Sequence, residues 1–236
     1  MKRTLLALLG ISCLLFADDE VKQKVQVTHT QTVALPAGGQ LRFVNSIGEL
    51  TVEGWDRPDV EITTIQSTKD EYASRDREKA TRELDKVKVS VALKGADVVI
   101  TTDYPRRRAL SPARLLGTAA GFDLEYRIKA PRNAGLEVDL ATGEVHVQDM
   151  TADIHATVHS GLISLNLPQE SVYDIDAKSE LGEVISDFPG HRERTRVFGH
   201  QFVQGTPAAH KLYLRAGFGD IIIFRIQKPA SAATAR

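Results

Sequence analysis

The 236-residue chain has one cysteine, almost no net charge and no long apolar run, and each shortage excludes a class of protein. The single cysteine, Cys13, excludes an intramolecular disulfide framework and a cysteine-rich zinc site. Lys and Arg number 30 against 31 Asp and Glu, so no basic excess indicates nucleic-acid binding. No stretch reaches the roughly 20 apolar residues of a membrane-spanning helix. The 42% hydrophobic and 26% charged residues that are present are typical of a globular protein.

Residues 1–17 have the layout of a secretory signal peptide. Lys2 and Arg3 form a positive start, an apolar run follows, and Ala17 offers a small residue for cleavage before an acidic stretch. Cleavage there would also remove Cys13. Two alternatives are an uncleaved segment that tethers the protein to a membrane and a lipoprotein modified at Cys13. We therefore expect an exported protein that is periplasmic, on the outer surface or extracellular.

Apolar and polar residues alternate through most of the remaining chain, a pattern typical of half-buried strands. One unit recurs five times: a short alternating segment, then a glycine seven residues after its first apolar residue, or nine in one copy. Because glycine adopts positive φ without a steric penalty, we interpret these glycines as corners of the chain. They are Gly48, Gly143, Gly161, Gly182 and Gly219.

The copies that begin at residues 136, 154, 173 and 212 are separated by 18, 19 and 39 residues, so the last interval is close to two periods. This spacing predicts an all-β fold, a right-handed β-helix-like or single-sheet β-solenoid with repeats of about 20 residues around a shared core. The alternative is an antiparallel β-sandwich in which each glycine closes a hairpin. The core positions predicted by the alternation are Leu136, Val138, Leu140, Val145, Val147, Ile154, Val158, Ile163, Leu165, Ile175, Val184, Leu214, Ile221 and Ile223.

The β-repeat domain is predicted to span residues 36–226, after a linker or strand over 18–35 and before a disordered tail over 227–236. Two insertions interrupt it. The first, about 68–86, is rich in charged residues and lacks Gly and Pro over 70–86, which favours a short surface helix. The second, about 104–121, is a long excursion between strands. Its basic residues could make weak contact with an anionic membrane surface or a polyanion, although we favour a solvated, mobile loop. Those basic residues are Arg106, Arg107, Arg108 and Arg114.

Several segments resemble the bacterial putative adhesin family of β-strand-repeat envelope proteins, a domain of unknown function. They are Val52–Val60 with its Gly-Trp-Asp-Arg-Pro motif, Glu125–Pro131, the corners at Ser160–Gly161 and Ser179–Gly182, Phe188–Gly190 and Gly217–Ile221. The resemblance covers residues 36 to 226. It implies an extended, exported β-solenoid domain without an established catalytic activity. The segment from Arg192 to His200 departs from the repeat, and we expect an irregular coil there.

Three histidines, His146, His155 and His159, are candidate metal ligands, provided that stacking brings His146 beside one of the other two. We favour a solvated polar face, because no cysteine or spaced carboxylate accompanies them. Outward carboxylates recur on successive repeats, and stacking would align some of them into a ladder that attracts Ca²⁺. Because the glycine-rich calcium repeat is absent, a solvated face is again the preferred interpretation. These carboxylates are Glu137, Asp139, Glu144, Asp153, Asp174, Asp176 and Glu183.

An enzyme on such a fold would need converging carboxylates in a groove. Asp174 and Asp176 share one strand face, and Arg127 or Lys178 could assist them, but any polar strand face satisfies this spacing. Trp55 could stack on a sugar, although we favour a turn residue that packs over the first coil.

We therefore expect a non-enzymatic exported protein that acts in interaction, adhesion or structural support at the cell envelope. We expect no catalytic, metal-binding or cofactor-binding residue, and a partner that is an envelope or extracellular protein or glycan and not nucleic acid. The alternatives are a carbohydrate-active β-helix enzyme, such as a polysaccharide lyase or hydrolase, and a periplasmic ligand-sensing module.

Overall fold

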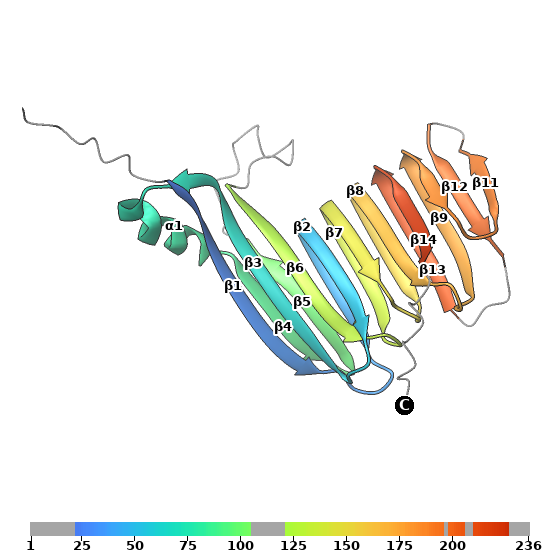
Figure 1. Cartoon of the computed structure of the whole chain (residues 1–236), viewed down its shortest axis with the longest axis horizontal. Coiled ribbons are helices and arrows are strands. Elements are labelled where there is room, and N and C mark those ends of the chain that lie inside the picture. The colour runs from blue at the N-terminus through green and yellow to red at the C-terminus, as the bar shows by residue number, and fades with distance from the viewer. Residues whose placement is uncertain (1–21, 105–120, 196–197, 206–209, 227–236) are drawn as a thin grey trace, which may run out of the picture.

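The computed structural model describes residues 22–104, 121–195, 198–205 and 210–226, which form a long row of strands with one helix at its end (Figure 1). The predicted signal peptide, the tail over 227–236 and the arginines of the second insertion lie outside the described residues. The elements are β1 (Gln23–Ala34), β2 (Gln40–Trp55), β3 (Asp59–Tyr72), η1 (Ser74–Asp76), α1 (Arg77–Leu84), β4 (Lys88–Lys94), β5 (Asp97–Asp103), β6 (Phe122–Pro131), β7 (Gly135–Gln148), β8 (Ile154–Pro168), β9 (Tyr173–Leu181), β10 (Val184–Ser186), β11 (His191–Arg194), β12 (His200–Gln204), β13 (His210–Phe218) and β14 (Ile221–Ile226).

All the strands belong to one 14-stranded sheet that bends into two wings. The first wing contains β4, β5, β13, β9, β12, β11 and the first halves of β2, β7 and β8. The second wing contains β1, β3, β6, β14, β10 and the second halves of the same three strands. The wings face each other across the core, where the Phe43 ring of the first wing meets the Tyr126 ring of the second at 4.9 Å. This is a β-solenoid-like fold, as the repeats predict.

The bend lies at the five glycines that the repeats single out, and all five have positive φ, between 133° and 152°. They stack into a ladder in which four of the five, all but Gly48, pack on the carbonyl of a neighbouring glycine. A Cβ on Gly143 would lie 1.8 Å from the Gly48 oxygen, one on Gly161 would lie 1.7 Å from the Gly143 oxygen, and one on Gly219 would lie 1.7 Å from the Gly161 oxygen. A Cβ on Gly182 would lie 2.1 Å from the Gly219 oxygen. Both the backbone conformation and the close approach therefore require glycine.

The coils do not stack in the order of the sequence. A coil is one first-wing segment, its corner and the second-wing segment that follows. Both halves of β2 lie between the β5–β6 coil and β7. The β13–β14 coil likewise lies between β8 and the β9–β10 coil. The first and last coils of the chain are thus interior, with a hydrogen-bonded neighbour on each side.

The strands that meet at the corners pair in parallel, so the antiparallel-sandwich alternative is wrong for the centre of the molecule. Antiparallel strands occur at the two ends of the row: β1, β3 and β4 at one end, and β12 with β11 at the other. The expectation of an irregular coil between Arg192 and His200 is also wrong, because this region contributes to the β11–β12 hairpin. The β11–β12 hairpin extends the end of the first wing by two strands, and it does not form part of another coil.

The core lies between the wings and contains every position that the alternation predicts, each no more than 2% exposed. Two polar side chains, Asn45 and Ser179, lie at opposite ends of one row of inward-facing residues that runs across neighbouring strands of the first wing. Asn45 donates from Nδ2 to Thr102 Oγ1 at 3.0 Å and accepts from the Tyr104 hydroxyl at 2.8 Å. Ser179 donates to the Gly219 carbonyl at 2.7 Å. Both of these buried side chains thus have hydrogen-bond partners, as burial requires.

The expected helical insertion is present as η1 and α1. The helix lies at the surface but buries two apolar residues: Ala80 and Leu84 pack with Val25 of β1 in a small cluster beside the main core. The strand β3 extends to Tyr72, so the insertion begins later than residue 68.

We expect Val138→Asp to abolish cooperative folding, because Val138 is 2% exposed and an unpaired buried charge costs several kcal/mol. Thermal denaturation followed by circular dichroism measures this. Ala141→Asp, at an exposed position of the same strand, should leave the melting temperature close to that of the wild type. An unchanged melting temperature for Val138→Asp would refute the placement of the core.

We expect Gly161→Ala to lower the free energy of unfolding by at least about 3 kcal/mol, because backbone strain and a collision with the Gly143 carbonyl add together. Gly38→Ala is the matched control, since Gly38 has a φ of 77° but open space where the Cβ would lie. It should cost only about 1 kcal/mol. Urea denaturation compares the two, and equal losses would show that close stacking does not constrain the corner.

Candidate functional site

The solvent-facing side of the first wing is a regular surface, which we call the outer face. It is built from six neighbouring strands, β2, β7, β8, β13, β9 and β12, and their registers place one outward side chain from each strand in each row. One row contains Arg42, Glu137, His155, Tyr213, Asp176 and Val203. The next contains Val44, Asp139, Thr157, Arg215, Lys178 and Gln201.

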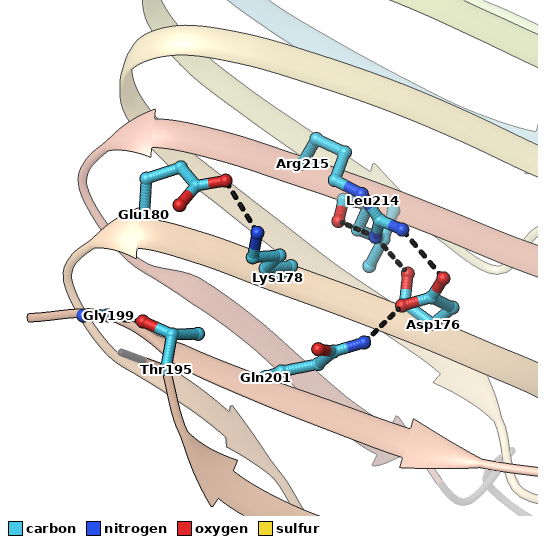
Figure 2. A network of polar contacts seen from close by, with 8 residues as sticks. All are labelled: Asp176, Lys178, Glu180, Thr195, Gly199, Gln201, Leu214 and Arg215. Carbon is cyan, nitrogen blue, oxygen red and sulfur yellow. Dashed lines mark hydrogen bonds and ion pairs between the residues drawn. The ribbon is translucent and has the colours of Figure 1, made fainter. Parts of the chain in front are cut away.

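Arg215 and Asp176 form the polar centre of the outer face (Figure 2). Arg215 Nη2 donates to Asp176 Oδ2 at 2.6 Å, and Nη1 donates to the Asp176 backbone oxygen at 2.9 Å. Gln201 Nε2 approaches from the other side and donates to Asp176 Oδ1 at 3.1 Å. Both carboxylate oxygens are therefore occupied, and the guanidinium is held in one orientation.

An aromatic contact lies beside this centre. The Arg215 guanidinium covers the Tyr213 ring at 3.8 Å from its centroid, and the His155 ring lies 5.5 Å from it. Tyr213 nevertheless remains 42% exposed. Elsewhere on the outer face Val203, two strands away, is 37% exposed, and Val44, three strands away, is 41% exposed. Apolar and aromatic area is thus exposed among fixed charges, a composition typical of interaction surfaces.

Smaller ion pairs extend the surface on both sides. Arg42 Nη2 lies 2.9 Å from Glu137 Oε1 near one end, and Lys178 Nζ lies 2.7 Å from Glu180 Oε1 near the other. Beyond them, the Gly199 N–H donates to Thr195 Oγ1 at 3.1 Å and the Thr195 N–H donates to the Gly199 oxygen, which closes the β11–β12 hairpin. The hairpin holds Gln201 of β12 in its place beside Asp176.

The three candidate metal ligands do not come together. His155 and His159 share the outer face but lie four residues apart on one strand, roughly 13 Å. His146 follows the Gly143 corner and therefore lies on the second wing, where its Nε2 is 3.1 Å from Glu144 Oε2. The condition for a shared site, stacking of His146 beside another of the three, is not met. Among the described residues, no group of three or more His, Cys, Asp or Glu is arranged to hold a metal ion.

The predicted carboxylates do not form one ladder through all the coils. Glu144 lies beside Glu49, and Glu49 lies beside Glu125, but the coil on the other side of Glu144 places Leu162 next to it, so this short row of glutamates ends there. Glu137 lies between Arg42 and His155, and Asp139 lies between Val44 and Thr157. Glu183 pairs with Arg192 on the hairpin side, away from both. The sequence repeats in its apolar positions, but its charged positions vary from coil to coil.

The residues that the carbohydrate-active enzyme alternative would use are either paired with other side chains or lie on the other wing. Asp176 is bonded as described, Lys178 pairs with Glu180, and Arg127 lies on β6 of the second wing, where it pairs with Glu125. Trp55 ends β2, and its Nε1 donates to the Asp59 oxygen at 2.8 Å, so it closes the β2–β3 turn as the preferred interpretation expects.

A groove of about 510 Å³ runs along the turns that join successive coils. Proline, alanine and glycine dominate its lining. Asp153 and His210 are its titratable groups; Asp153 Oδ1 accepts the Lys211 backbone N–H at 2.8 Å and lies 3.8 Å from His210 Nδ1. The carboxylate thus holds the start of β13 in place.

Tyr213, Arg215 and Gln201 were not singled out by the sequence. The alternation in the segment Leu212–Ala216 places Tyr213 and Arg215 outward, but their partners depend on which coil lies next to β13. Arg215 reaches Asp176 only because β13 pairs with β9, which precedes it by a hairpin in the sequence.

Comparison with known proteins extends this picture. A putative cell adhesion protein from Clostridium sporogenes has a similar fold, with a TM-score of 0.52 at 14% identity over 86% of this chain and 100% of the other. A putative adhesin from Bacteroides fragilis matches with a TM-score of 0.30 at 10% identity over 85% of this chain and 97% of the other. A search of curated proteins found no match. Within the described ranges, no helix is long and apolar enough to span a bilayer.

The family assignment comes from the sequence itself. The profile of the Toastrack DUF4097 family matches residues 55–223, which include four of the five corner glycines and all the strands of the outer face except β2. The chain belongs to the Toastrack DUF4097 family.

Proposed function

We propose that this is an exported, non-enzymatic protein that acts in interaction, adhesion or structural support at the cell envelope, and that the outer face is its contact surface. The observation that carries the proposal is the regular array of rows on six neighbouring strands. Neighbouring strands lie about 4.8 Å apart, so the face repeats its contacts at a fixed pitch. A surface of this kind suits an extended polymer or a flat protein partner better than a small molecule.

The state of the polar groups supports a binding role. The Asp176 carboxylate accepts a hydrogen bond from Arg215 at one oxygen and from Gln201 at the other, so it holds these two side chains in position on the outer face. The same bonds fix the Arg215 guanidinium over Tyr213 before any partner arrives. A rigid aromatic and charged centre of this kind binds with little loss of side-chain entropy.

Two further observations support export and adhesion. The first 17 residues have the pattern of a signal peptide. A neighbour with the same fold, from Clostridium sporogenes, carries a name that refers to cell adhesion.

A screen of envelope glycans, polymers and extracellular proteins against the purified protein, with product release measured on the same panel, tests the proposal. We expect binding without turnover. The double variant Tyr213→Ala and Arg215→Ala should weaken that binding about tenfold or more, because central aromatic and arginine contacts dominate interfaces. Phe224→Ala is the matched control, since Phe224 is 43% exposed but lies on the second wing.

Three outcomes would contradict the proposal. Product release from any polymer would support the carbohydrate-active enzyme instead. Binding of a small soluble ligand alone would support the ligand-sensing module. Equal loss of binding in the Phe224→Ala control would place the contact surface elsewhere.

A further inference from the structure

The strand β1 forms the outer edge of the second wing and is paired on one side only. It runs antiparallel to β3 from Gln23 to Ala34, and no other strand of the described chain pairs with it. In such a pair, every second residue of the edge strand points its N–H and C=O away from its neighbour. The free side of β1 is therefore a row of hydrogen-bonding groups able to accept another strand.

The features by which proteins protect a sheet edge are confined to the N-terminal end of β1, where Lys24 lies beside a β-bulge between Lys24 and Gln26. From Val25 to Ala34 the strand has no charged residue, no proline and no glycine, and Thr28 to Thr32 are all exposed. The other edges differ. β11 has the sequence His-Arg-Glu-Arg with all four side chains exposed, β4 begins and ends with lysine, and β10 has three residues. Charge and short length discourage pairing at those edges.

The helix α1 limits which part of β1 is free. Ala80 and Leu84 pack on Val25, and Arg77 Nη2 donates to Gln23 Oε1 at 2.5 Å, so the helix lies at the N-terminal end of the strand (Figure 1). No such contact involves Thr28 to Ala34. This uncharged segment of seven residues, centred on Gln31, is the open part of the edge.

We infer that a second copy of this chain pairs with this segment, antiparallel, about a two-fold axis at Gln31. In that register Thr30 of one copy lies opposite Thr32 of the other, and His29 lies opposite Val33. Threonine pairs across antiparallel strands are favourable, and no like charges meet. Each helix α1 then lies at an outer end of the paired segment, where it does not obstruct the other copy.

The second copy fits this edge better than a head-to-tail arrangement of copies would. Head-to-tail stacking would place the twelve-residue β1 against the three-residue β10 or the charged β11. When two copies of β1 pair with each other, the two strands have the same length and both paired segments are uncharged. A two-fold contact also closes after two copies, because it uses the β1 edge of both and leaves no β1 edge for a third copy.

Sedimentation velocity of the purified protein over a range of concentrations tests the inference. We expect a dimer for the wild type. The double variant Thr30→Lys and Thr32→Lys places like charges opposite each other twice and should raise the Kd of the dimer about tenfold or more. Thr30→Glu with Thr32→Glu should do the same, and an equimolar mixture of the two variants should form a heterodimer.

A charge-matched control is Gln148→Lys with Gln169→Lys, two exposed positions away from β1, which should dimerise like the wild type. A monomeric wild type at every concentration would overturn the inference, and so would a lysine variant at β1 that still dimerises normally. Failure of the mixed lysine and glutamate variants to form a heterodimer would overturn the register at Gln31. None of these measurements involves an envelope ligand, so their outcome is independent of the proposed function.

Discussion

The close stacking of five glycines at one corner is the constraint on which the rest of this structure depends. Five coils, those of β2, β7, β8, β9–β10 and β13–β14, turn from the first wing to the second at a glycine with positive φ, and successive glycines approach so closely that a side chain on Gly143, Gly161 or Gly219 would collide with a backbone carbonyl. The corner therefore brings backbone against backbone in each of these coils, which keeps the strand registers of both wings in step. Ser179, buried at the end of the ladder, donates to the Gly219 carbonyl.

Because all five corners have the same geometry, a coil can occupy any level of the stack. The order of the coils in the stack accordingly differs from their order in the sequence. The first and last coils, β2 and β13–β14, are inserted between coils from the middle of the sequence. The insertion gives each of them two hydrogen-bonded neighbours, so neither is an end that frays. It also creates the polar centre of the outer face, since Arg215 meets Asp176 only across the β13–β9 pair.

The sequence predicts what depends on local pattern and misses what depends on the order of the coils. Alternation identifies core residues such as Val138 and Ile163, and the recurring glycine identifies the corner, because both are properties of one repeat. Coil order depends on where each coil finds neighbours in space, and every coil has a similar apolar pattern. The partners of outward residues therefore could not be predicted, and the sequence left open whether His146, which lies beyond its corner glycine, would stack beside the histidines of the other wing.

We expect the glycine corner and the inserted coils to make the whole stack one cooperative unit. Native-state hydrogen exchange of the backbone amides tests this most directly. If the claim is right, buried amides of β2, β7, β8 and β13 exchange with the same free energy, equal to that of global unfolding. Exchange of β13 and β14 through a separate opening of lower energy, while β7 and β8 stay protected, would contradict it.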